Sequence, residues 1–203
     1  MKFPFYKPLD VICIDGRDYE LCLTLENVLR YFDLSENPEG LTPADIDEIM
    51  ISWFVPEYHT SDREKISAVM RIIEHDYIDT GKRQVRSRRK NGKVVDFTLD
   101  SGYIYAAFMQ TYGIDLYDCA DELNWRKFIF LFENLPENTA IAQIMSIRAR
   151  EVDPKATPEE QQRLAELKVM YALPNSSPSS EADSRNMLNG LFDFLYKKAK
   201  GGG

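Results

Sequence analysis

The stretch VICIDGRDYELCLTLENVLRYF, residues 11–32, predicts how the fold begins. Asp15-Gly16 separates two runs of alternating apolar side chains, which is a strong short-range signal for a β-hairpin. From Thr24 the apolar spacing lengthens to about 3.6 residues, so a helix is expected to follow. A two-stranded hairpin is marginal by itself in water, and we therefore expect it to pack on helices. The face that would pack carries Ile12, Ile14, Tyr19, Leu21 and Leu23.

Most of the remaining sequence has helical periodicity. Residues 42–45 and 157–160 each combine a capping threonine, a proline at the first helical position and an acid in the first turn. Residues 61–64, Ser-Asp-Arg-Glu, have the pattern of a capping box. Further helices are expected to begin near Asp100, Leu123 and Pro136. The predicted fold class is mainly α, with six to seven short helices and the N-terminal hairpin packed on them.

Two segments in the middle of the chain are expected to form most of the core. The helix that begins near Asp100 should present one apolar side, formed by Tyr103, Ile104, Ala107, Phe108 and Tyr112. The segment LNWRKFIFLF, residues 123–132, is apolar on more than one face. It is therefore predicted to be a central helix that packs on several sides, with Trp125 and Phe128 largely buried.

Composition and charge exclude several classes of protein. The 203 residues are 44% hydrophobic and carry a net charge of -8, which suits a soluble chain with a real core. The longest apolar runs are too short to cross a membrane, and the first residues do not resemble a secretory signal. Three irregularly spaced cysteines argue against a disulfide framework and favour a reducing cytoplasm. The acidic balance disfavours general nucleic-acid binding, because neutralising phosphates supplies most of that affinity.

Catalytic and metal-binding patterns are weak. His75 stands near Asp76 and Asp79, but no cysteine or second histidine completes a zinc set there. Clustered carboxylates lie at predicted helix starts, where the helix dipole explains them. Nucleophile motifs and phosphate-binding glycine loops are not found. We therefore predict no enzymatic activity, no catalytic residues, no metal site and no cofactor.

A basic run at residues 82–93 is the unusual feature of the sequence, with seven Lys or Arg side chains and no acid. It contains no aromatic side chain for stacking on bases. Three interpretations stay open: a solvated mobile loop, a contact with an acidic partner, and a nucleic-acid-binding regulator. Residues 84–88 and 94–97 could also pair as a second small hairpin. The candidate partner-binding residues here are Lys82, Arg83, Arg86, Arg88, Arg89 and Lys90.

The C-terminal region is set apart by composition. Residues 1–174 are expected to form a single helical domain, and residues 175–180 are rich in Ser and Pro, as linkers are. Residues 181–200 are predicted to form an amphipathic helix that docks on its own domain, on a neighbouring copy or on a partner. Residues 201–203 are glycines and are left out of the fold. The apolar stripe of this helix consists of Leu188, Leu191, Phe192 and Leu195.

Several segments together resemble the gp-fifteen family of bacteriophages. The N-terminal pattern is a strand, Asp15-Gly16, a second strand and the helix of residues 24–32. The more specific part is YIYAAFMQTYGIDL, residues 103–116, followed by LNWRKF, residues 123–128. Weaker agreement continues through Ile147-Arg148 and YALP, residues 171–174. The resemblance spans most of residues 10–174.

This resemblance implies a non-enzymatic tail-assembly chaperone of a phage or prophage. Such a protein would coat the long tape-measure protein, recruit subunits of the major tail protein around it, and then leave. It would act in the cytoplasm of the bacterial host and would not be part of the mature virion. Self-association is compatible with this role, whereas membrane binding is not expected.

Overall fold

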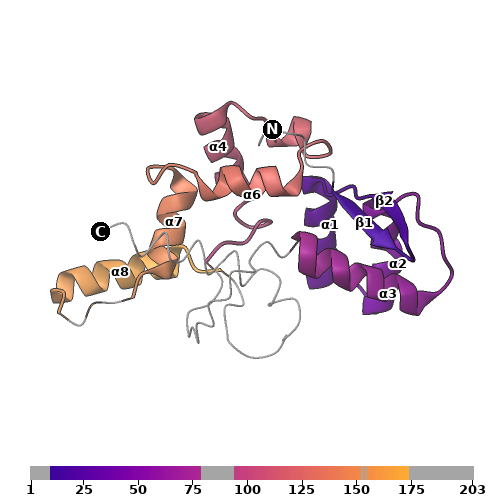
Figure 1. Ribbon diagram of the computed structural model, residues 1–203. Coiled ribbons are helices and arrows are strands. Elements are labelled where there is room, and N and C mark those ends of the chain that lie inside the picture. Colours follow the sequence, from indigo (N-terminus) through magenta and orange to yellow (C-terminus); the bar gives the residue numbers. More distant parts are fainter. Residues whose placement is uncertain (1–9, 79–93, 152, 154, 174–203) are drawn as a thin grey trace. The chain divides into compact units, whose positions relative to one another are not determined.

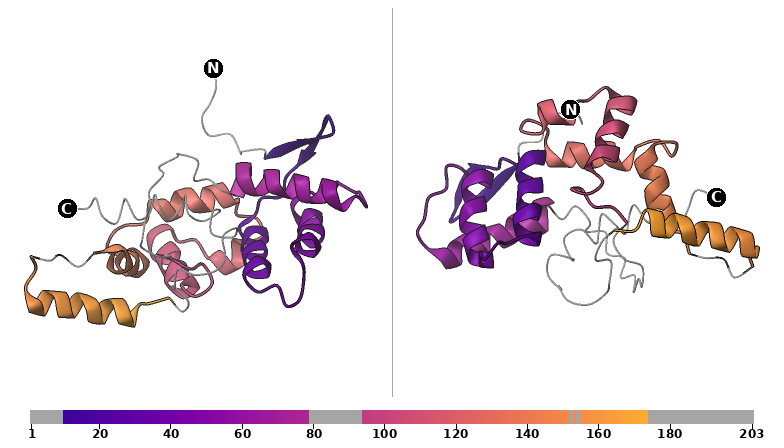
Figure 2. Two further views of the ribbon diagram at one scale, coloured as in Figure 1. Left: turned by 90° about the horizontal axis from the view of Figure 1, so that it is seen from below. Right: turned by 180° about the vertical axis from the view of Figure 1, so that it is seen from behind.

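The computed structural model describes residues 10–78, 94–151, 153 and 155–173. They belong to two compact units, whose elements are drawn in Figures 1 and 2. The first unit contains the chain up to Ile78 together with Ala120–Trp125, and the second contains Asp79–Cys119 and the chain from Arg126 onward. The expectation that residues 1–174 form a single domain stays a prediction.

The predicted fold class is confirmed. The described residues contain seven α-helices of nine or more residues, one helix of four residues, and a two-stranded antiparallel sheet near the N-terminus. The seven longer helices correspond to the seven helices that the sequence predicts before residue 174. The predicted helix of residues 181–200 lies outside the described residues.

The hairpin of the first unit consists of β1, Val11–Ile14, and β2, Arg17–Glu20. The strands pair antiparallel, and Ile12 lies opposite Tyr19. Asp15 and Gly16 have φ angles of 50° and 80°. Positive φ at both central residues defines the turn that matches the natural twist of paired strands. The β-hairpin that Asp15-Gly16 predicts is thereby confirmed.

Contacts with later elements fix this hairpin inside the first unit. Ile12 and Ile14 are buried, whereas Val11 and Cys13 point to solvent. The Tyr77 hydroxyl donates a hydrogen bond of 2.6 Å to the Val11 carbonyl. The second predicted strand is shorter than expected, because β2 ends at Glu20. Leu21 and Leu23 are nevertheless buried.

Three helices and one π-helical turn complete most of the first unit, and their starts follow the capping signals. Thr42 forms a reciprocal capping box with Asp45, and the hydroxyl of Thr24 accepts a hydrogen bond from the Asn27 amide. The third helix is capped by Asp62 and not by the predicted box from Ser61, because the Asp62 carboxylate reaches the amides of Glu64 and Lys65. The elements are α1, Leu25–Glu36; α2, Pro43–Phe54; α3, Arg63–Ile72; and η1, Ile73–Ile78.

Residues 120–125 return to the first unit and close its core. The Leu25 amide donates to the Leu123 carbonyl at 2.7 Å, and the Trp125 amide donates to the Leu23 carbonyl at 2.8 Å. The indole of Trp125 is buried, donates to the Ile78 carbonyl at 3.2 Å and meets the Phe32 ring edge to face. The predicted burial of Trp125 is confirmed.

The second unit is built around aromatic rings. Phe128 stacks on Phe108 with a centroid distance of 5.1 Å, and the edge of Phe97 packs against it at 5.8 Å. Phe128 is 2% exposed, as predicted, but Phe130 on the same helix is 66% exposed. The elements are α4, Ser101–Tyr112; α5, Leu116–Cys119; α6, Trp125–Glu133, which begins with the last residue of the first unit; α7, Ala140–Ala149; and α8, Pro158–Met170.

A buried ion pair connects four segments of the second unit. Arg148 on α7 donates two hydrogen bonds to the Asp100 carboxylate, which precedes α4, at 2.6 and 2.9 Å. The same guanidinium donates to the Val94 carbonyl at 3.0 Å and to the Tyr171 carbonyl, after α8, at 2.6 Å. The side chains of Arg148 and Asp100 are 10% and 3% exposed. One side chain thus satisfies acceptors from segments far apart in the sequence.

Two expectations for this unit are wrong. Residues 94–97 are not a solvated strand, because they form a bend and a turn and Val94 and Val95 are buried. The partner segment of that hairpin, residues 84–88, lies outside the described residues. Helix α7 begins at Ala140 and not at Pro136, since the Thr139 hydroxyl bonds to the Pro136 carbonyl in a turn before the helix.

Phe128→Ala should destabilise the second unit by about 3–5 kcal/mol, because it removes a fully buried ring and leaves a cavity. Urea unfolding followed by far-ultraviolet circular dichroism measures this change. Phe130→Ala is the matched control on the same helix, and its effect should stay within about 0.5 kcal/mol. Equal effects of the two substitutions would contradict the assignment of Phe128 to the core.

Arg148→Met should cost about 3–5 kcal/mol, because the Asp100 carboxylate would stay buried without its charged partner. The double variant Arg148→Met with Asp100→Leu should recover much of that loss, since no buried charge then remains. Arg150→Met, an exposed change two residues away, serves as the control. The ion pair would not be structural if Arg148→Met unfolded at the same urea concentration as the unchanged protein.

Candidate partner-binding surface

The residues that the sequence singled out for partner binding all lie outside the described residues. This holds for the six basic residues between Lys82 and Lys90 and for the four apolar residues between Leu188 and Leu195. Their roles stay predictions. The structure instead presents an exposed apolar surface on a helix that was expected to face the core.

Helix α4 contains no charged residue, although half of it faces solvent. Ile104, Ala107 and Phe108 are buried in the second unit. Tyr103 is 44% exposed, which corrects the expectation that it lies on the buried side. A solvent-facing helix usually carries charged or polar side chains on its outer side. We call this surface the α4 face; it consists of Leu99, Tyr103, Ala106 and Met109, all exposed.

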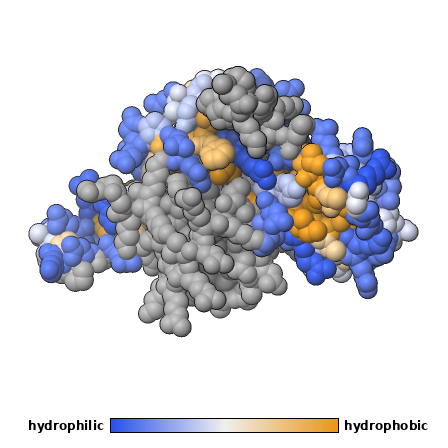
Figure 3. Space-filling view, in the orientation of Figure 1, coloured by the Kyte–Doolittle hydropathy of each residue, from blue (hydrophilic) through white to orange (hydrophobic). Residues whose placement is uncertain are grey.

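Spacing along the helix makes these side chains neighbours. Tyr103, Ala106 and Met109 follow one another at three-residue intervals, and residues three or four apart adjoin on a helix surface. Figure 3 shows hydrophobic side chains at the surface in the region where Figure 1 draws α4 and α6. The α4 face is therefore a continuous uncharged stripe, which is the kind of surface that binds another apolar surface.

Two tyrosines extend this stripe beside an acidic turn. Tyr105 and Tyr117 lie with ring centroids 4.9 Å apart, and the Tyr105 hydroxyl is 3.2 Å from the Asp115 carboxylate. Desolvation raises the pKa of Tyr105, and the hydrogen bond and charge of Asp115 raise it further. The phenol therefore stays protonated and donates. Tyr117 is largely exposed, so an aromatic ring is available to a partner at this edge.

The support beneath the α4 face is rigid. The Phe108 ring stacks on Phe128, and the Tyr112 hydroxyl donates to the Leu131 carbonyl at 2.8 Å. At the other end, Asp100 is held by Arg148. A binding surface on a well-packed helix is preformed, so a partner does not have to order it. The sequence signal that could have located this surface is the complete lack of charge in residues 101–112.

The ionisable groups of the first unit have structural explanations. His75 and Asp76 form an exposed contact of 2.6 Å, and Asp79 lies outside the described residues. Within the described part of the chain, His, Cys, Asp and Glu form no group of three that could hold a metal ion. Burial raises the pKa of the Cys22 thiol, and the charge of Glu20 raises it further. Activated thiols show the opposite shift.

Glu74 on η1 is a half-buried carboxyl of this unit, and its pKa shift has a clear physical cause. Desolvation raises the pKa of Glu74, the hydrogen bond from the Tyr31 hydroxyl lowers it, and the nearby charge of Asp47 raises it again. Tyr31 is itself buried, and the same surroundings raise its pKa. The pair links α1 to η1 and is part of the core of the first unit.

The structure thus defines a mainly helical protein with an N-terminal hairpin and an exposed uncharged helix face. Among the described residues, no helix combines the length and the apolar character needed to span a membrane. The family model described as Bacteriophage Gp15 protein matches residues 7–173, and the chain belongs to this family. The resemblance found in the sequence is confirmed. Comparison with curated proteins and with solved structures gave no match.

Glu74→Gln should raise the melting temperature at pH 7. The raised pKa means that the folded state binds the proton more tightly than the unfolded state. The stability from this group is therefore fully present below the unfolded pKa of about 4.3 and is lost as pH rises through the folded pKa. The advantage of Glu74→Gln should vanish near pH 4, where the natural carboxyl is protonated as well. Melting curves between pH 4 and pH 8 measure this.

Glu57→Gln is the control, because Glu57 is exposed in the loop after α2. This substitution removes one negative charge, as Glu74→Gln does, but from an exposed side chain and not from a half-buried one. If both variants shift the melting temperature equally at every pH, net charge and not burial explains the effect of Glu74.

Proposed function

We propose that this protein is a non-enzymatic tail-assembly chaperone, which binds the tape-measure protein and brings subunits of the major tail protein to it. Membership of the Bacteriophage Gp15 family supports the phage setting. The observation that carries the proposal is the α4 face, an exposed stripe without charge on a rigid helix. The tape-measure protein is the proposed occupant of this face.

The side chains of the α4 face suit a partner with many similar apolar helical segments. Tyrosine combines a large apolar ring with a polar end, and methionine adapts its shape to different neighbours. Amphipathic helices bind such surfaces through apolar side chains three and four residues apart. A stripe of four side chains therefore favours binding of repeated segments without a fixed sequence.

The small size of the α4 face also suits an assembly factor. Each fully buried apolar side chain contributes about 1.5–3 kcal/mol, and association costs offset much of that gain. A single contact would be weak, while several copies along one long partner would hold it together through multivalency. Polymerising tail subunits could then displace the copies one at a time, so that the chaperone is left out of the mature virion.

Charge keeps the free copies apart. The net charge of -8 makes copies of the chain repel one another in the host cytoplasm. Asp115 and Asp118 place carboxylates next to the exposed ring of Tyr117. The basic run would supply a salt-sensitive contact to an acidic segment of a partner, through Lys82, Arg83, Arg86, Arg88, Arg89 and Lys90.

Co-expression with the tape-measure protein of the same phage tests the proposal. The variant Ala106→Glu with Met109→Glu places two charges on the α4 face without changing a buried side chain. We expect the unchanged protein to keep the tape-measure protein soluble and to co-purify with it. The variant should lose most of both effects, because burying an unpaired carboxylate is strongly unfavourable.

Ile72→Glu is the matched control, since Ile72 is an exposed apolar residue on α3 of the first unit. It should leave co-purification unchanged, and circular dichroism should show that all variants are folded. Equal binding by the α4 variant would remove the α4 face from the proposal. Copurifying nucleic acid that is lost at high salt, in place of tail proteins, would favour the regulator suggested by the basic run.

A further inference from the structure

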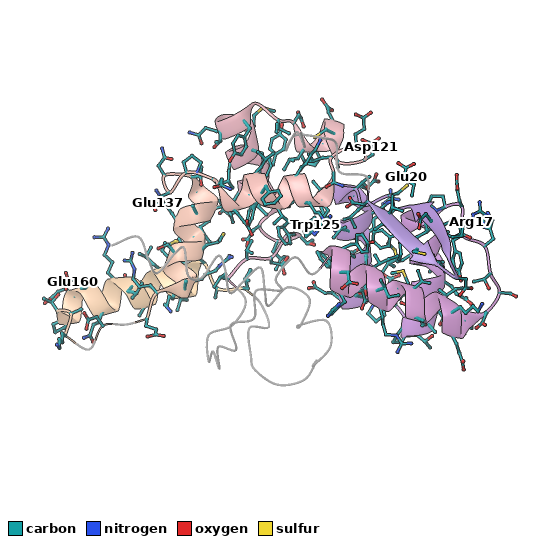
Figure 4. The ribbon with its side chains drawn as sticks, viewed as in Figure 1. Arg17, Glu20, Asp121, Trp125, Glu137 and Glu160 are labelled. Carbon is teal, nitrogen blue, oxygen red and sulfur yellow. The ribbon has the colours of Figure 1, made fainter. Side chains whose placement is uncertain are left out.

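The sheet of the first unit has two strands, so each strand has one outer edge. In an antiparallel ladder, pairs that exchange hydrogen bonds alternate with pairs whose N–H and C=O groups point away from the neighbouring strand. The Leu21 amide donates to the Asp10 carbonyl at 2.8 Å, which identifies this pair as a bonded one. By the register of the strands, the main-chain groups of Asp18 and Glu20 therefore point outward from β2. We call these groups the β2 edge; Figure 4 shows Arg17 and Glu20 at the two ends of the strand.

Hydrogen bonds to later residues close other parts of the hairpin. On β1, the Val11 carbonyl accepts a hydrogen bond from the Tyr77 hydroxyl at 2.6 Å. Directly beyond β2, the Cys22 amide donates to the Phe54 carbonyl at 2.8 Å. The β2 edge differs, because both of its residues are exposed and its outward groups have no hydrogen-bond partner within the described part of the chain. Unpaired main-chain groups at the edge of a sheet are a template for another strand.

We propose that the β2 edge binds an extended segment of a partner protein that carries Lys or Arg at alternate positions. An extended chain adds to an exposed sheet edge through main-chain hydrogen bonds, and its alternate side chains give specificity. In antiparallel addition, the partner residues that bond to Asp18 and Glu20 also lie directly opposite them. Opposite charges at directly opposed positions stabilise a strand pair, so both positions favour a basic side chain. The proposal does not depend on the chaperone function.

The charges of the β2 edge disfavour a second copy of the chain as its occupant. Both residues that turn main-chain groups outward from β2 are acidic. Two copies that join this edge antiparallel must pair outward residues with outward residues, so at least one acid always lies opposite another acid. Like charges directly opposite each other are destabilising. This repulsion is a source of specificity, because it rejects the strand's own copy and any acidic strand while a basic strand is attracted.

The residue between the two acids determines the middle position of the partner segment. Tyr19 is half-buried, and its ring meets the Tyr58 ring edge to face with centroids 5.5 Å apart. The Arg17 guanidinium lies 5.0 Å from the centroid of the same Tyr19 ring. Because strand side chains alternate, the middle residue of the added segment lies on the Tyr19 side of the sheet. An apolar side chain suits this side, where Arg17 repels a further positive charge. The expected partner pattern is therefore basic, apolar, basic.

Hydrogen exchange of the full-length chain with two synthetic peptides tests the proposal. The probe is acetyl-Lys-Val-Lys-Val-Lys-amide, which has the expected pattern and high strand propensity at its valines. At saturating probe, the amides of Asp18 and Glu20 should exchange at least about tenfold more slowly, because the probe then bonds to them. The matched control peptide carries N-methyl groups on its three lysine amides. It keeps every charge but cannot donate to the β2 edge, and it should leave exchange unchanged.

Charge reversal gives a second test. The variant Asp18→Lys with Glu20→Lys should lose the lysine probe and bind the corresponding Glu-Val-Glu-Val-Glu peptide, whereas Asp121→Lys with Glu122→Lys, an equal change at two exposed acids, should still bind the lysine probe. The proposal is overturned if the probe does not slow exchange in the unchanged protein, or if the N-methylated peptide slows it equally. Protection without probe that falls on dilution would overturn it too, because a second copy would then occupy the edge.

Discussion

The second unit depends on the ion pair between Arg148 and Asp100. A guanidinium presents donors in a fixed planar fork, so its position determines where each acceptor must lie. Here the acceptors are the carboxylate before α4 and the carbonyls of Val94 and Tyr171. Because the charges are buried, an imperfect arrangement would be costly. The pair therefore fixes the start of α4 and the residue after α8 relative to α7. The aromatic rings fill the space between these helices.

The α4 face is a consequence of this arrangement. Hydrophobic packing by Phe108 and the polar anchor at Asp100 together select which side of α4 is buried. The other side, with Tyr103 and Met109, is left at the surface. An apolar side chain on a soluble protein is ordinary when it stands alone, but a stripe of several without any charge is typical of a binding surface.

Local signals in the sequence predicted local structure well. The Asp15-Gly16 turn and the helix cap at Thr42 depend on neighbouring residues only, and both formed as expected. The side of α4 could not be predicted in this way, because its residues are apolar nearly all round and periodicity does not choose between Tyr103 and its neighbours. The Arg148–Asp100 pair joins residues 48 positions apart, which no short motif records. The candidate surface was therefore visible only once long-range contacts were known.

The positions of the two tryptophans make the two units optically different. Trp53 and Trp125 both belong to the first unit, and the second unit contains tyrosine and phenylalanine as its aromatic residues. Trp125 is buried with its indole bonded to a carbonyl, so its emission should shift to longer wavelength when water reaches it. Intrinsic tryptophan fluorescence thus follows the first unit, to which Trp125 belongs as the first residue of α6. Comparison with circular dichroism, which records helices of both, would reveal whether the units unfold together or in succession.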